Sequence, residues 1–70
     1  MDKYKIPYFN MIIRKFAERY NLSLDKTFNY LYKYGGIKYL VDYYHIEHLL
    51  PVDDTLDELV LTCRDAGGGL

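Results

Sequence analysis

The sequence predicts an all-α fold, a compact three- or four-helix domain, and three observations support this expectation. Apolar residues recur three and four positions apart in successive segments, which is the spacing of an amphipathic helix. No segment shows the strict alternation of a half-buried strand, and no internal repeat is visible. The connections between the segments are short, which favours antiparallel neighbouring helices.

The first predicted helix extends from about Pro7 to Tyr20. Pro7 suits the first turn, where its missing N–H is not needed. The apolar face of this helix consists of Phe9, Ile12, Ile13, Phe16, Ala17 and Tyr20.

The second predicted helix follows Ser23, whose hydroxyl suits an N-cap, and Asp25 favours the helix dipole in the first turn. It ends at Gly35-Gly36, one of which is expected in the left-handed conformation of a helix C-terminus. The side chains expected to face inward are Leu24, Thr27, Phe28 and Leu31.

The third predicted helix begins near Ile37 and must end before Pro51, because proline disfavours helical backbone at the preceding residue. The spacing predicts that its inner face consists of Ile37, Leu40, Val41 and Tyr44. His48 would continue this stripe, whereas Ile46 would not.

The fourth predicted helix is expected to have Asp53 or Asp54 as its N-cap, with Asp57 and Glu58 near its positive end. Its apolar face is expected to consist of Leu56, Leu59, Val60 and Cys63. The glycines at 67–69 end it, so we expect one helical domain over residues 1–66 and a flexible glycine-rich tail over residues 67–70.

Composition excludes several classes of protein. The net charge is −1 with both signs interspersed, which argues against nucleic-acid binding through clustered Lys and Arg. No apolar run approaches the length of about 18 residues that a membrane span needs, so we expect no membrane partner. Cys63 is the only cysteine, which rules out an internal disulfide and fits a reducing compartment, so a cytoplasmic location is expected.

No combination of residues predicts an enzyme, and we expect no catalytic residue, metal or cofactor. His45 and His48 are three apart and could share a metal, but they lack an obvious third ligand. We expect His45 to be solvated and His48 to pack under the last helix. Cys63 lies on an apolar face, where a cysteine behaves as a small hydrophobe rather than a nucleophile.

The tyrosine pattern is the clearest indication of function. The chain has nine Tyr and no Trp, and two pairs with a spacing of four flank the double glycine, namely Tyr30/Tyr34 and Tyr39/Tyr43. Tyr is favoured at interfaces because one end of its side chain is apolar and the other polar. The pattern predicts a non-enzymatic protein-binding module or a homodimer that uses these four rings. The alternative is that the rings fold back and complete a thin core.

A second hypothesis is a small helix-turn-helix-like DNA-binding regulator, because two helices meet at a glycine turn. The outward residues of the second of these helices would be Lys38, Tyr39, Asp42 and Tyr43. One lysine beside an aspartate offers few hydrogen-bond donors for contacts with base edges. A basic strip around Arg14, Lys15 and Arg19 would be needed to hold the phosphate backbone.

Over residues 8 to 62 the chain resembles a family of short, uncharacterised bacterial proteins known only as a domain of unknown function. The resemblance rests on residues at characteristic spacings along the chain rather than on one motif. These residues are Phe16-Ala17-Glu18, Asn21-Leu22-Ser23, Phe28, Leu31, Gly35 or Gly36, Ile37, Tyr39-Leu40, Tyr44, His48, Asp53-Asp54 and Asp57-Glu58. Members of that family are often encoded beside an ADP-ribosyltransferase-like protein, in the manner of a toxin with its antitoxin. The resemblance therefore implies a small neutralising or accessory partner, and it implies no residue roles.

Overall fold

The fold is known from a computed structural model that describes residue 3 and residues 5–70. Its helices are α1 (Lys5–Tyr20), α2 (Leu24–Lys33), α3 (Gly36–Asp42), α4 (Tyr44–Glu47) and α5 (Val52–Asp65), and the described residues contain no strand. The radius of gyration is 11.0 Å, close to the value of about 11 Å expected for a compact chain of this length. The all-α prediction is therefore confirmed, whereas the predicted number of three or four helices is too low.

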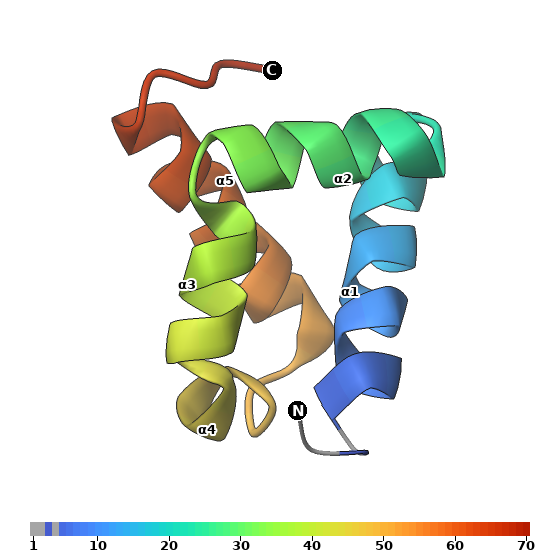
Figure 1. The fold of residues 1–70 in the computed structure, drawn as a ribbon, viewed down its shortest axis with the longest axis vertical. Helices are drawn as coiled ribbons and strands as arrows, with labels where there is room; N and C mark the ends of the chain where they lie inside the picture. Colours follow the sequence, from blue (N-terminus) through green and yellow to red (C-terminus); the bar gives the residue numbers. More distant parts are fainter. Residues whose placement is uncertain (1–2, 4) are drawn as a thin grey trace.

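Helices α1 and α3 form two sides of the molecule, α2 crosses one end between them, and α5 packs against both (Figure 1). The core lies where these helices meet. Its fully buried apolar members are Ile12, Phe16, Leu31, Leu40, Leu56, Leu59 and Cys63. The inner faces predicted for the first and last helices are confirmed, since every predicted residue there is buried or packs against this core.

The predicted inner face of α2 is half wrong. Thr27 and Leu31 are buried, but Leu24 and Phe28 are 53% and 45% exposed. A similar correction applies to α3, where Leu40 is buried and Val41 is exposed. Because α2 crosses the ends of its neighbours rather than running alongside them, it brings only a narrow stripe of side chains into the core.

Two of the predicted helix ends are confirmed. The Ser23 hydroxyl accepts a hydrogen bond of 3.1 Å from the backbone N–H of Lys26. Gly35 has φ 83°, the left-handed conformation expected of one residue in the double glycine. The second glycine is needed for packing, because a Cβ at Gly36 would lie 2.9 Å from Leu31 Cδ2 and 3.2 Å from Cys63 Sγ.

The start of the last helix differs from the prediction. Pro51 occupies the N-cap and makes no side-chain capping bond, so α5 begins at Val52. Asp53 and Asp54 therefore lie in the first turn rather than at the cap. Their charges still face the positive end of the helix dipole, which accounts for acidic residues at these positions.

The extra helix arises because the predicted third helix breaks at Tyr43. The backbone there has φ −112° and ψ 18°, outside the helical region. The chain resumes one helical turn as α4, in which the N–H groups of Ile46 and Glu47 both donate to the carbonyl oxygen of Tyr43. This break rotates α4 relative to α3 and decides which side chains of residues 44–50 face solvent.

Candidate functional site: an outward apolar ridge

The first tyrosine pair packs on the folded domain. The rings of Tyr30 and Tyr34 lie 5.3 Å apart on α2, both side chains are half-buried, and Tyr30 also stacks near Phe16 at 6.0 Å. The Tyr30 hydroxyl donates a hydrogen bond to the carbonyl oxygen of Gly68, which is itself buried. For this pair the arrangement corresponds to the alternative in which the rings complete a thin core.

The second tyrosine pair is divided between core and solvent. The rings of Tyr39 and Tyr43 lie 4.9 Å apart, but Tyr39 is half-buried against the core whereas Tyr43 is 47% exposed. Among the described residues no ring contact joins this pair to the pair on α2. The four predicted binding residues therefore form two separate pairs, of which Tyr43 is the most exposed member. Their role in binding stays a prediction.

An exposed apolar ridge begins at Tyr43 and continues along α4 and the turn that follows. We use "apolar ridge" for Tyr43, Ile46, Leu49 and Leu50, all of which are exposed. The N–H of Ile46 donates to Tyr43 O and that of Leu49 donates to Ile46 O, both three residues back. Tight turns of this kind align side chains three positions apart, so Tyr43, Ile46 and Leu49 lie along one side of the segment. Leu50 follows Leu49 in the chain and is 39% exposed.

The opposite side of the same segment is anchored to the domain. Tyr44 makes edge-on contacts with Tyr8 and Phe9 of α1, at ring distances of 5.3 and 5.9 Å. Glu47 is only 2% exposed, and its Oε1 has no hydrogen-bond partner among the described residues. The polarity of the segment is thus inverted, with a carboxyl group inside and large apolar side chains outside.

Burial is the main reason why the pKa of Glu47 is raised above its ordinary value. The Tyr39 hydroxyl acts in the opposite direction by hydrogen bonding, and the charges of Glu58 and Asp54 on α5 raise the pKa further. The same surroundings raise the pKa of Tyr39 to about 12, with burial as the largest cause and Glu47 as the next. The carboxyl group of Glu47 is therefore held in a site that favours its neutral form.

In the described part of the chain, no three or more His, Cys, Asp or Glu side chains lie together in a way that could hold a metal ion. His45 is exposed, as expected. His48 is also exposed, which corrects the prediction that it packs under the last helix; it stacks on Tyr44 at 4.6 Å, with Nδ1 2.6 Å from Tyr44 O. Cys63 is buried as predicted, and burial raises the pKa of its thiol, which disfavours the thiolate.

The basic strip that DNA binding would need is interrupted by carboxylates. Arg19 Nη1 lies 2.7 Å from Asp57 Oδ1, and its Nη2 lies 3.3 Å from Asp53 Oδ1. Lys15 Nζ lies 3.6 Å from Glu18, and Lys38 is paired with Asp42 on α3. These pairs reduce the positive charge available to phosphates on α1, which would carry the basic strip, and on α3, which would be the recognition helix.

Sequence reasoning missed Ile46, Leu49 and Leu50 as candidate site residues. One signal was available, because Ile46 does not continue the apolar stripe of the preceding helix. The break at Tyr43 turns this mismatch into an exposed side chain. Periodicity alone gives no information on where such a break falls, so the outward direction of the apolar ridge could not be derived.

The comparisons with known proteins give one match. A family model described as "Protein of unknown function (DUF3791)" matches residues 7–65. The comparison with curated proteins found no match, and neither did the comparison with solved structures. Within the described residues, no helix is long and apolar enough to cross a membrane.

Proposed function

This chain belongs to the DUF3791 family of proteins of unknown function, and from that premise we propose that it is a non-enzymatic protein-binding module. The partner would cover the apolar ridge of Tyr43, Ile46, Leu49 and Leu50. The single observation that carries this proposal is the inverted polarity of the segment that contains α4.

The inversion is costly for a domain that acts alone. Leu49 is 75% exposed while Glu47, two residues away, is 2% exposed. Burying a carboxyl group without full hydrogen bonding is unfavourable, and exposing leucine forgoes the gain from its burial. A protein partner that covers the exposed side recovers the free energy of burying these leucine side chains. Contiguous apolar surface on a small soluble domain is typical of an interaction site.

We infer that the partner is a second bacterial protein in the cytoplasm, and that the chain serves it as an antitoxin-like or accessory protein. The support is the resemblance to small proteins encoded beside an ADP-ribosyltransferase-like protein. Four exposed acidic residues on the first turns of α5, namely Asp53, Asp54, Asp57 and Glu58, lie just after the apolar ridge in the chain, and only Asp53 and Asp57 are paired with Arg19. Acidic residues beside an apolar patch favour a basic partner, since complementary charge raises the association rate.

The experiment is a binding titration between the purified chain and the protein encoded by the adjacent gene. Ile46→Asp and Leu49→Asp should each weaken association by more than tenfold, because a carboxylate would have to be desolvated at the interface. Their melting temperatures should stay close to wild type, since both side chains are exposed.

Leu61→Asp is the matched control, because Leu61 is an exposed leucine on α5 outside the apolar ridge. This variant should bind as wild type does. The proposal is contradicted if the neighbouring protein does not bind, or if the ridge variants and the control bind alike. A DNA fragment retarded by the chain at low salt and released at high salt would favour the DNA-binding alternative instead.

A further inference from the structure

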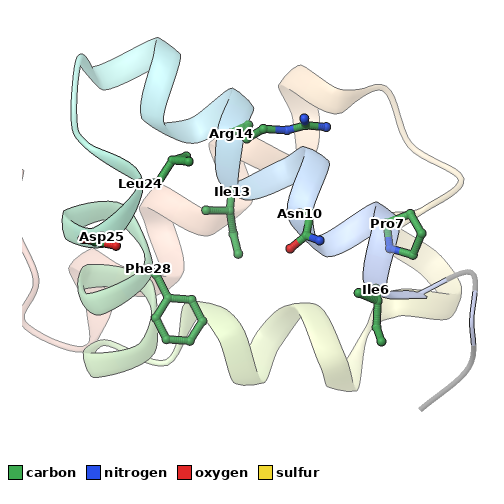
Figure 2. Close-up of a pocket in the computed structure, with 8 residues that line it drawn as sticks. All are labelled: Ile6, Pro7, Asn10, Ile13, Arg14, Leu24, Asp25 and Phe28. Atoms are coloured by element: carbon green, nitrogen blue, oxygen red, sulfur yellow. The ribbon is translucent and has the colours of Figure 1, made fainter.

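A second apolar surface lies between α1 and the start of α2 and shares no residue with the apolar ridge. It is an open groove with a volume of about 610 Å³, drawn in Figure 2. Ile6, Leu24 and Phe28 line it and are all about half exposed. The groove continues past Ile6 and Phe28 into a smaller apolar hollow of about 180 Å³ that reaches Val41 on α3.

Two opposite charges also line this groove. Arg14 belongs to α1 and Asp25 to the first turn of α2, and both are exposed. Neither forms an ion pair within the described part of the chain, although Lys15 and Arg19 on the same helix both do. In Figure 2 the Arg14 side chain extends away from Asp25, and Leu24 and Ile13 lie between the two charges.

A surface that carries one positive and one negative group across an apolar centre is complementary to itself. In a two-fold symmetric interface each residue contact occurs twice, so that Arg14 can meet the partner's Asp25 while Asp25 meets the partner's Arg14. The apolar side chains between the charges then face their own counterparts near the symmetry axis. We propose that this groove is the interface of a homodimer, held by these two reciprocal ion pairs around a centre of Leu24 and Ile13.

The charges favour a second copy over other occupants of the groove. A purely apolar segment of another protein would gain nothing from the charges of Arg14 and Asp25, since it offers them no complementary charge. A second copy pairs both charges at once. It also covers side chains that a chain of 70 residues has no room to bury, and small domains commonly gain stability by such association.

The homodimer is independent of the proposed partner at the apolar ridge. Figure 1 places α4 at the end of the molecule away from α2. The two surfaces share no residue. A chain that dimerises and binds no second protein, or the reverse, would therefore separate the two proposals.

The test is the solution mass of the full chain, measured by sedimentation equilibrium over a range of concentrations. Wild type should reach twice the monomer mass. Arg14→Asp and Asp25→Arg alone should each raise the dimer dissociation constant by about tenfold or more, because each replaces two attractive contacts by two repulsive ones. The double variant should return to the wild-type dissociation constant, since it restores opposite charges in exchanged positions.

Mixing the two single variants gives a sharper test. One variant carries two carboxylates at these positions and the other carries two guanidinium groups, so the mixture should form a heterodimer more tightly than either variant forms a homodimer. Lys26→Glu, a charge reversal on α2 at a residue that does not line the groove, is the control and should dimerise as wild type does. Thermal melts verify that each variant is folded.

Three outcomes would overturn the proposal. Wild type could remain monomeric at the highest concentration, which would leave the groove to a different protein. The single variants could dimerise as tightly as wild type, which would put the dimer contact elsewhere. The mixed variants could also fail to associate while the melts show them folded, which would exclude the reciprocal pairing of Arg14 and Asp25.

Discussion

The hydroxyl of Tyr30 donates a hydrogen bond to the carbonyl oxygen of Gly68, 38 residues further along the chain. The turn that brings Gly68 there closes α5. Gly67 has φ 94°, and the N–H of Gly68 donates to Cys63 O at 2.8 Å, as in a Schellman motif. The last turn of the chain is thereby joined to α2, and Gly68 lies against the ring of Tyr34.

Gly68→Ala should destabilise the domain. A Cβ at this position would lie 2.4 Å from Cγ of Tyr34, closer than atoms can approach, so the ring or the turn must move. Overpacking of this kind lowers the free energy of unfolding by about 1–3 kcal/mol. Urea unfolding followed by circular dichroism measures the change.

Gly69→Ala provides the matched control, because nothing lies within 4 Å of a Cβ at Gly69. Its unfolding midpoint should equal that of wild type. If Gly68→Ala also left the unfolding midpoint unchanged, residues 67–70 would behave in solution as the flexible tail that their composition predicts. The contact with Tyr34 would then contribute nothing to stability.

The core prediction compares two phenylalanines. Phe16 is fully buried, and Phe16→Ala should lower the free energy of unfolding by about 3–5 kcal/mol, a large share of the stability of a small domain. Phe28→Ala should cost far less, because Phe28 is 45% exposed at the groove. Thermal or urea melts of both variants check the ranking. Equal losses would mean that Phe28 is as important to the core as Phe16.

Helical periodicity predicted the long helices and most of the core, because residues such as Ile12, Phe16 and Leu59 repeat at the spacing of one helix face. It failed where the angle between helices decides burial. Leu24 and Phe28 share a face with Leu31, yet only Leu31 reaches the core because α2 crosses its neighbours. A sequence pattern defines the apolar face of a helix but not how much of that face a neighbour covers.

The candidate site was harder to predict than the fold. The spacing of the tyrosines correctly grouped them in pairs, since Tyr30 contacts Tyr34 and Tyr39 contacts Tyr43. It could not separate the rings that pack on the domain from the one that faces solvent. That difference depends on tertiary contacts, such as the approach of Gly68 to α2, and these join residues far apart in the sequence.

The division of the second tyrosine pair predicts two different phenotypes. Tyr43→Ala should leave the melting temperature close to wild type and weaken binding at the apolar ridge, since the side chain is 47% exposed. Tyr39→Ala should lower the melting temperature clearly, because the ring packs against the core.

Tyr39→Phe separates the ring of Tyr39 from its hydroxyl. This variant keeps the ring packing but removes the hydrogen bond to the buried Glu47, so its melting temperature should fall less than that of Tyr39→Ala. A stable Tyr39→Ala variant would show that the ring is not part of the core, and a destabilised Tyr43→Ala variant would contradict its assignment to the binding surface.

Glu47 predicts an unusual dependence of stability on pH. Its folded-state pKa is raised, chiefly by burial, so between the ordinary and the raised pKa the folded chain binds more protons than the unfolded chain. This group therefore contributes stability that is fully present below the ordinary glutamate pKa of about 4.3. The contribution declines as the pH rises through the folded-state pKa, because the buried carboxyl group must then ionise.

Glu47→Gln removes this ionisation while keeping the shape of the side chain. We expect the variant to be more stable than wild type at neutral pH and to lose the part of the decline that Glu47 causes, measured by urea unfolding at a series of pH values. Glu18→Gln is the control, because Glu18 is exposed and should keep the wild-type profile. Equal pH profiles for wild type and Glu47→Gln would mean that water reaches the carboxylate in solution. The 2% exposure of Glu47 would then fail as evidence that α4 is held with its carboxyl group inward, and the argument for an outward apolar ridge would weaken with it.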